Sequence, residues 1–137
     1  RAYGAAATAR GNARLLGLGE RAGFAVGDWA AAIGGKFDAV VANPPYIPSG
    51  EIAGLPPEVR DFDPVLALDG GMDGLSAYWR IARELPRLLA PGGLFACEVG
   101  AGQAKAVAEI VAAAGLAIEA IIPDLAGIPR CVVARRR

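Results

Sequence analysis

Residues 37–46 read FDAVVANPPY, an apolar run followed directly by Asn43-Pro44-Pro45-Tyr46. The run Phe37–Ala42 has the length and the apolar character of a buried strand. In open α/β sheets ligands bind at the carboxyl ends of the strands, so a polar residue in the position of Asn43 lies where a ligand is expected. This stretch therefore predicts an α/β sheet and the location of its functional site.

The four residues after this strand suit the recognition of a planar NH2 group. Two consecutive prolines fix the backbone and remove two N–H donors, which leaves main-chain carbonyl oxygens free to accept hydrogen bonds. We expect the side-chain oxygen of Asn43 and the carbonyl of Pro44 to accept the two hydrogens, and the ring of Tyr46 to stack on the flat group. The alternative is that Pro44-Pro45 is only a turn and Asn43 a cap, which is common for isolated Asn-Pro pairs.

Composition narrows the class of protein. The chain has 137 residues and a formal net charge of zero. That length suits a single domain with its own core, so residues 1–137 are expected to form one domain. Because the chain has no basic field that would attract phosphates, direct nucleic-acid binding is not expected.

The chain contains no histidine, which excludes histidine catalysis and histidine-ligated metals. Cys97 and Cys131 lie in separate apolar runs, so they form neither a metal-ligand pair nor a disulfide framework and are expected to be buried thiols. No apolar run reaches transmembrane length, and the first residues have no signal-peptide pattern. We therefore expect a cytoplasmic protein with no metal and no membrane contact.

Helical and extended patterns alternate along the chain. The expected helices cover residues 3–18, 30–33, 73–85 and 102–114, and the expected strands cover 24–26, 37–42, 94–99, 116–122 and 131–134. Asp73 is expected to cap the third helix and Pro86 to kink or restart it. The pattern predicts a mostly parallel sheet with helices on both faces, and an antiparallel hairpin of the last two strands. The proline-rich residues 48–64 are expected to form a substrate-facing loop.

Further motifs accompany the central stretch. They are Asp63-Pro64 with Ala67-Leu68, GGMDGL at 70–75, EVG at 98–100 followed by Gln103, and DLAG at 124–127 followed by Arg130. With these motifs the chain resembles, over essentially its whole length, the class I S-adenosylmethionine-dependent methyltransferases. Asn-Pro-Pro-Tyr alone is shared with DNA adenine and rRNA guanine methyltransferases. The 70–75 motif and the Glu98 to Gln103 spacing narrow the resemblance to the release-factor glutamine N5-methyltransferases (HemK/PrmC family).

This resemblance implies a Rossmann-like sheet and the cofactor S-adenosylmethionine. It implies methyl transfer to the side-chain amide nitrogen of the glutamine in the Gly-Gly-Gln motif of peptide chain release factors. The implied residues are Asp28, Trp29 and Asn43 for the cofactor, Asn43, Pro44, Pro45 and Tyr46 for the substrate, and Asn43, Pro44 and Tyr46 for catalysis. The alternative for Asp28 is a cap on the next short helix, and for Trp29 a place in the core.

One departure from the family pattern concerns the cofactor. The glycine-rich loop after the first strand and the acidic residue after the second are both absent from this sequence. We therefore expect a C-terminal part of a methyltransferase domain without its first two strands, in which the inner edge of the strand 37–42 is exposed. These 137 residues alone are expected to bind the cofactor poorly and to be inactive.

Several alternatives remain open at this point. The substrate could instead be a ribosomal-protein glutamine or a nucleic-acid amino group, or the chain could be an inactive fragment or an interaction module. Glu98 could face the site, pair with Arg130 or cap a helix. Asp124 and Arg130 are expected to form a surface pair. The residues of the 69–73 segment are expected to form a turn and a helix cap, with substrate contact as the alternative.

Overall fold

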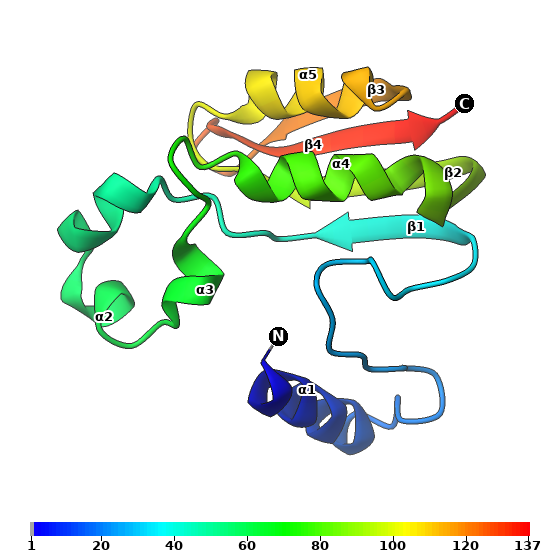
Figure 1. Ribbon diagram of the computed structural model, residues 1–137, viewed down its shortest axis with the longest axis horizontal. Coiled ribbons are helices and arrows are strands. Elements are labelled where there is room, and N and C mark those ends of the chain that lie inside the picture. Colours follow the sequence, from blue (N-terminus) through cyan, green and yellow to red (C-terminus); the bar gives the residue numbers. More distant parts are fainter. Residues whose placement is uncertain (1) are drawn as a thin grey trace. The chain divides into compact units, whose positions relative to one another are not determined.

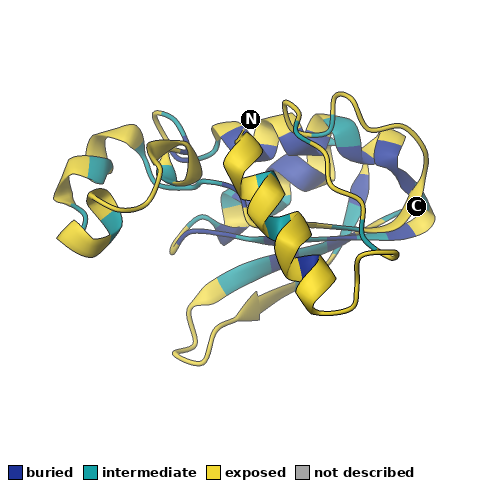
Figure 2. Cartoon of the chain, turned by 90° about the horizontal axis from the view of Figure 1, so that it is seen from below, coloured by how far each residue is buried: buried dark blue, intermediate teal, exposed yellow. Residues whose placement is uncertain are grey.

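The computed structural model describes residues 2–137, which divide into two compact units, one ending at Ile33 and one spanning Gly34–Arg137. The first unit contains helix α1, Tyr3–Leu15, in which only Ala13 is buried (Figures 1 and 2). The expected strand at 24–26 is not formed, and residues 30–33 form turns instead of a helix. A three-residue apolar run between glycines is too short to hold a strand without a partner. The expectation of a single domain over 1–137 stays a prediction.

The second unit is built on a four-stranded sheet in the order β1-β2-β4-β3. Its strands are β1 Phe37–Ala42, β2 Leu89–Glu98, β3 Leu116–Pro123 and β4 Pro129–Arg136. β1 and β2 are parallel, whereas β4 runs antiparallel to both β2 and β3. The expected α/β sheet with an antiparallel C-terminal hairpin is confirmed. One of the three pairings in this sheet is parallel, so the sheet is mixed where a mostly parallel one was expected.

Two helices, α4 Ser76–Leu88 and α5 Ala104–Ala113, cover the same face of this sheet (Figure 1). α4 packs on β1 and β2, and α5 packs on β3 and β4. Their apolar faces meet alternate residues of the strands, and one buried cluster results. Its fully buried members include Tyr78, Leu85, Phe95, Val107 and Val132. The core of the second unit therefore lies between the helices and the sheet.

β1 is an edge strand and is less buried than its sequence suggests. It pairs only with β2 in the sheet, and Val41 is 79% exposed. Val40 and Ala42, which face the helices, are only partly buried. The expectation of a buried strand is therefore wrong for β1, because it has one strand neighbour and helices on one face only. The expected exposed edge is present.

The proline-rich residues 48–64, expected to form an irregular loop, contain two short helices, and a third follows before α4; whether this segment faces a substrate stays a prediction. The three helices are η1 Ser49–Gly54, α2 Pro57–Arg60 and α3 Val65–Leu68. Pro48, Pro56 and Pro64 precede them directly, and a proline suits the start of a helix because its missing N–H has no helical partner there. In Figure 1 these helices extend from the carboxyl end of β1.

Three local expectations around α4 and β2 are corrected. α4 continues through Pro86 to Leu88 without a restart, and its N-cap is Leu75, not Asp73. Asp73 instead accepts the N–H of Leu75 through its side chain at 2.9 Å. β2 begins at Leu89, before the expected start at residue 94, and contains a bulge, because the register moves from Phe37 opposite Leu89 to Ala39 opposite Leu94.

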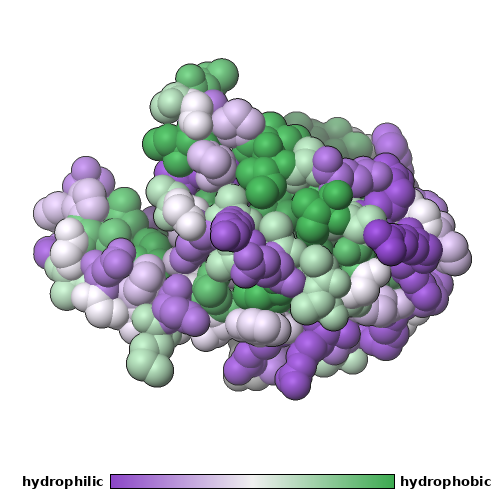
Figure 3. Space-filling view, turned by 90° about the horizontal axis from the view of Figure 1, so that it is seen from above, coloured by the Kyte–Doolittle hydropathy of each residue, from purple (hydrophilic) through white to green (hydrophobic). Residues whose placement is uncertain are grey.

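The exposed surface is chemically mixed. On the face shown in Figure 3, hydrophobic side chains gather toward the middle and hydrophilic ones lie along the lower and right margins. Apolar residues of the β3–β4 hairpin contribute to the exposed area of the second unit, including Ile121, Ile122 and Leu125.

Candidate functional site

The turn Asn43–Tyr46 leaves β1 at the carboxyl end of the parallel pair. Ala42 lies opposite Cys97, so the residues that follow, Asn43 and Glu98, lie at the same end of the sheet. Asn43 is exposed and Pro44 is buried. Within Gly34–Arg137 the Asn43 carboxamide forms no hydrogen bond to another residue. A polar group thus stands available at the position where open α/β sheets bind ligands.

The side chain of Tyr46 is held by the end of β2. Its hydroxyl donates to Oε1 of Glu98 at 3.1 Å, and both side chains are half-buried. Burial raises the pKa of Tyr46, and the hydrogen bond to the Glu98 carboxylate raises it further. Tyr78 of α4 donates to the main-chain oxygen of Glu98 at 3.0 Å. The neutral Tyr46 ring is therefore fixed at its hydroxyl end.

Of the alternatives for Glu98, the structure supports contact with the site, through Tyr46. The ion pair with Arg130 is not formed. Arg130 instead lies 3.4 Å from Oδ2 of Asp124, and this confirms the expected Asp124–Arg130 pair.

The main-chain carbonyl of Tyr46 is held by a residue that the sequence did not assign to the site. Nε2 of Gln103 donates to this carbonyl at 2.9 Å, and Oε1 of Gln103 accepts the N–H of Gly100 at 3.0 Å. In the sequence, Gln103 stands out only through its spacing after Glu98-Val99-Gly100. That spacing indicated a family resemblance but did not reveal that Gln103 contacts Tyr46.

Two glycines of the 70–75 motif pack against Tyr46. A Cβ on Gly74 would lie 2.4 Å from the Tyr46 carbonyl oxygen and 2.5 Å from Nε2 of Gln103. A Cβ on Gly70 would lie 2.8 Å from the Cα of Tyr46. Gly74 also has a φ of +75°, a conformation that favours glycine. This motif therefore serves as a close-fitting wall for the turn.

Residues 69–71 continue this wall by pairing with the chain after Tyr46. Ile47 and Asp69 form a parallel bridge, and the N–H of Gly70 donates to the Ile47 carbonyl at 2.9 Å. Oδ1 of Asp69 accepts the Ser49 hydroxyl at 2.7 Å and the Gly71 N–H at 2.8 Å, and these bonds, led by that from Ser49, lower the pKa of Asp69. The turn expected in the 69–73 segment is present.

Asp28 and Trp29, the expected cofactor residues, belong to the first unit. The carbonyl of Asp28 accepts the N–H of Ala31 at 3.2 Å within a turn, and no helix follows that Asp28 could cap. Trp29 has a φ of +52° and is 38% exposed, so it is not a core residue. Their joint role with Asn43 of the second unit stays a prediction.

Cys97 is a buried free thiol, and Cys131 is free and half-buried. Among residues 2–137, no group of three or more His, Cys, Asp or Glu side chains is placed to hold a metal ion. In the same residues, none of the helices has the length and the apolar composition needed to span a bilayer.

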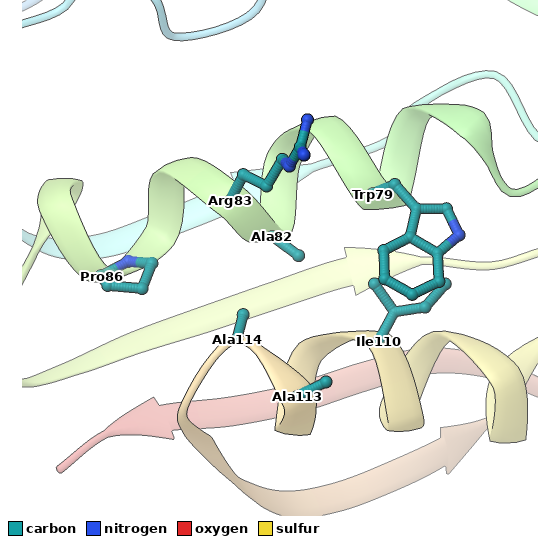
Figure 4. A pocket seen from close by; sticks show the side chains of 7 residues that line it. All are labelled: Trp79, Ala82, Arg83, Pro86, Ile110, Ala113 and Ala114. Atoms are coloured by element: carbon teal, nitrogen blue, oxygen red, sulfur yellow. The ribbon is translucent and has the colours of Figure 1, made fainter.

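A separate groove of about 500 Å³ runs between α4 and α5. Figure 4 shows side chains from both helices along it. It is lined by Trp79, Ala82, Arg83, Pro86, Ile110, Ala113 and Ala114. None of the expected site residues lines this groove, so it is distinct from the turn after β1.

No family model matches the chain. A release factor glutamine methyltransferase of Rhodospirillum rubrum is 57% identical over 136 residues, which are 99% of this chain and 42% of that protein. One from Bradyrhizobium diazoefficiens is 50% identical over 130 residues, covering 94% of this chain and 44% of its own length.

A solved structure also resembles this chain. It is the crystal structure of a protein-(glutamine-N5) methyltransferase (release factor-specific) from Alicyclobacillus acidocaldarius, with 31% identity and a TM-score of 0.50. The match covers 79% of this chain and 53% of that one. The chain spans less than half the length of these curated relatives. The resemblance inferred from the motifs is thereby confirmed: this chain is homologous, over nearly its whole length, to a part of the release factor glutamine methyltransferases.

Proposed function

We propose that a protein that contains this chain and has the full length of its relatives transfers a methyl group from S-adenosylmethionine to a glutamine side chain. The proposed acceptor is the amide nitrogen in the Gly-Gly-Gln motif of a peptide chain release factor. The observation that carries the proposal is the exposed Asn43 carboxamide beside a Tyr46 that is fixed at both its hydroxyl and its carbonyl. The names of the relatives support the substrate class. The predicted cytoplasmic location is part of the same proposal.

In this proposal the turn after β1 holds the glutamine carboxamide. Oδ1 of Asn43 and the carbonyl of Pro44 accept the two amide hydrogens, and Pro45 keeps the turn rigid. The ring of Tyr46 packs on the flat amide. An amide nitrogen is a weak nucleophile because its lone pair is delocalised, so orienting it and stabilising the charge that develops on it lower the barrier.

S-adenosylmethionine supplies, when bound, a methyl group on a positively charged sulfur, and we propose that Asp28, Trp29 and Asn43 contact it. The exposed Asn43 carboxamide and the partly exposed Trp29 ring fit such a role. The acceptor nitrogen loses its proton to solvent after the transfer. No dedicated base is needed, which suits a chain without histidine.

The test is a labelled-methyl assay with a protein of full length that contains these residues. A release factor, a ribosomal protein and duplex DNA are offered separately. We expect label in the release factor alone, and none when its acceptor glutamine is replaced by glutamate, which lacks the NH2 group. Label in DNA or in the ribosomal protein would identify one of the alternative substrates instead.

A further inference from the structure

We propose that Gln103 is a positioning residue for methyl transfer, which acts by holding the main-chain carbonyl of Tyr46. The inference rests on the proposed function and adds a residue to its machinery. Gln103 does not touch the substrate in this proposal. It fixes the backbone of the turn whose Asn43 and Pro44 oxygens grip the acceptor.

Both ends of the Gln103 carboxamide are engaged. Nε2 donates to the Tyr46 carbonyl at 2.9 Å, and Oε1 accepts the N–H of Gly100 at 3.0 Å. Gln103 is also the N-cap residue of α5, and its own carbonyl accepts the N–H of Val107 at 3.0 Å. The donor is therefore anchored on a helix that packs on the sheet, so it can hold the turn in one place.

The turn needs such a donor because its own backbone is poor in hydrogen-bonding groups. Pro44 and Pro45 have no N–H, so half of the four residues cannot donate to neighbouring elements. With fewer donors of its own, the turn depends more on donors from neighbouring elements. Gln103 supplies it at Tyr46, while Glu98 receives the hydroxyl of the same residue.

The hydrogen bond between Gln103 and Tyr46 is closely surrounded by glycines. Gly74 lies where a side chain would collide with both partners of the hydrogen bond, 2.4 Å from the carbonyl oxygen and 2.5 Å from Nε2. Gly100 likewise leaves room for the carboxamide, because a Cβ there would lie 2.6 Å from Oε1 of Gln103. Gly74 and Gly100 are both buried. Glycines on both sides thus make room for this one side chain.

The test compares Gln103→Glu with Gln103→Met in the full-length methyltransferase. Glutamate keeps the acceptor for Gly100 but sets a carboxylate against the Tyr46 carbonyl. Methionine keeps the length without the donor or the charge. We expect both variants to lower kcat about 10- to 100-fold, because a small displacement of the turn misaligns the acceptor nitrogen. For Gln103→Met the dissociation constant for S-adenosylmethionine should stay near the parent value. The unfolding temperature should fall by a few degrees, because two hydrogen bonds are lost, and kcat is therefore compared per folded protein at a temperature where both proteins are folded. The control Ala101→Glu adds a charge in the same loop, at an exposed position, and should keep the parent kcat.

The parent protein is first assayed on release factor, ribosomal protein and DNA, and the variants are then compared on the substrate it methylates. Parent-like kcat in Gln103→Met overturns the inference, as does a loss that appears only as weaker cofactor binding or in proportion to lost folded protein. A parent that labels DNA overturns the proposed function while the comparison of variants still decides the role of Gln103. A parent that labels nothing overturns both.

Discussion

The hydroxyl of Tyr46 donates a hydrogen bond of 3.1 Å to Oε1 of Glu98, and this bond joins the turn after β1 to the end of β2. The two residues lie 52 positions apart in the sequence. Because the bond orients the Tyr46 ring, it links the packing of the sheet to the place where we propose the acceptor amide lies.

Replacing this tyrosine by phenylalanine should therefore weaken the fold slightly and the reaction more. Tyr46→Phe keeps the ring and removes the hydroxyl, so we expect a loss of about 1 kcal/mol in the free energy of unfolding. Denaturant titration of Tyr46→Phe, Glu98→Ala and the double variant should give a coupling of about 1 kcal/mol. Tyr3→Phe is the matched control, since Tyr3 is 81% exposed, and should be neutral. Additive losses would argue against the bond.

The sequence predicted the elements whose apolar pattern is long and regular. Phe37–Ala42, the helix now assigned as α4 and the closing hairpin were all found. The strand predicted at residues 24–26 is not formed, because so short an apolar run needs a neighbouring strand to stabilise it. α4 continues through Pro86, although the proline cannot donate its helical hydrogen bond, and Leu85 and Leu88 on either side are buried and stabilise this last turn.

The sequence predicted the residues at the centre of the candidate site but not the residues that hold them in place. Asn43 and Tyr46 stand out because a polar residue and an aromatic ring flank two prolines after a strand. The contact of Gln103 with Tyr46 spans 57 residues and leaves no periodic pattern in the chain. Glu98 was recognised as a candidate, but its partner depends on the register of β1 with β2, which the sequence does not reveal.

Alanine at Gly74 should be more damaging than alanine at another glycine of similar conformation. Gly74 and Gly127 have φ values of +75° and +81°, so both substitutions strain the backbone. Only at Gly74 would the new methyl group collide with Tyr46 and Gln103, since nothing lies within 4 Å of a Cβ at Gly127. We expect Gly127→Ala to cost about 1 kcal/mol of stability and Gly74→Ala several times more, by thermal unfolding. Equal losses would mean that the wall around Tyr46 gives way easily.

Stability should fall as the solution becomes strongly alkaline. Burial raises the pKa of the Cys97 thiol from about 9 to about 12, and burial also raises the pKa of Tyr46. A group whose pKa is higher in the folded state contributes stability that is fully present below its unfolded pKa and is lost as pH rises through its folded pKa. The midpoint of denaturant unfolding should therefore fall between about pH 9 and 12. Cys97→Ala should flatten this decline, and an unchanged slope would contradict the assignment to Cys97.

Asn43→Ala in the full-length methyltransferase should lower turnover by about two orders of magnitude, because one acceptor of the amide hydrogens is lost. The fold should be little affected, since Asn43 is exposed and its carboxamide forms no hydrogen bond within Gly34–Arg137. Asn12→Ala makes the same chemical change at an exposed position of α1 and serves as the control. Turnover is measured by labelled-methyl transfer under cofactor saturation, and the folded fraction by circular dichroism. A near-normal rate in Asn43→Ala with an intact fold would remove Asn43 from the proposed grip on the acceptor and leave Pro44 as its only oxygen.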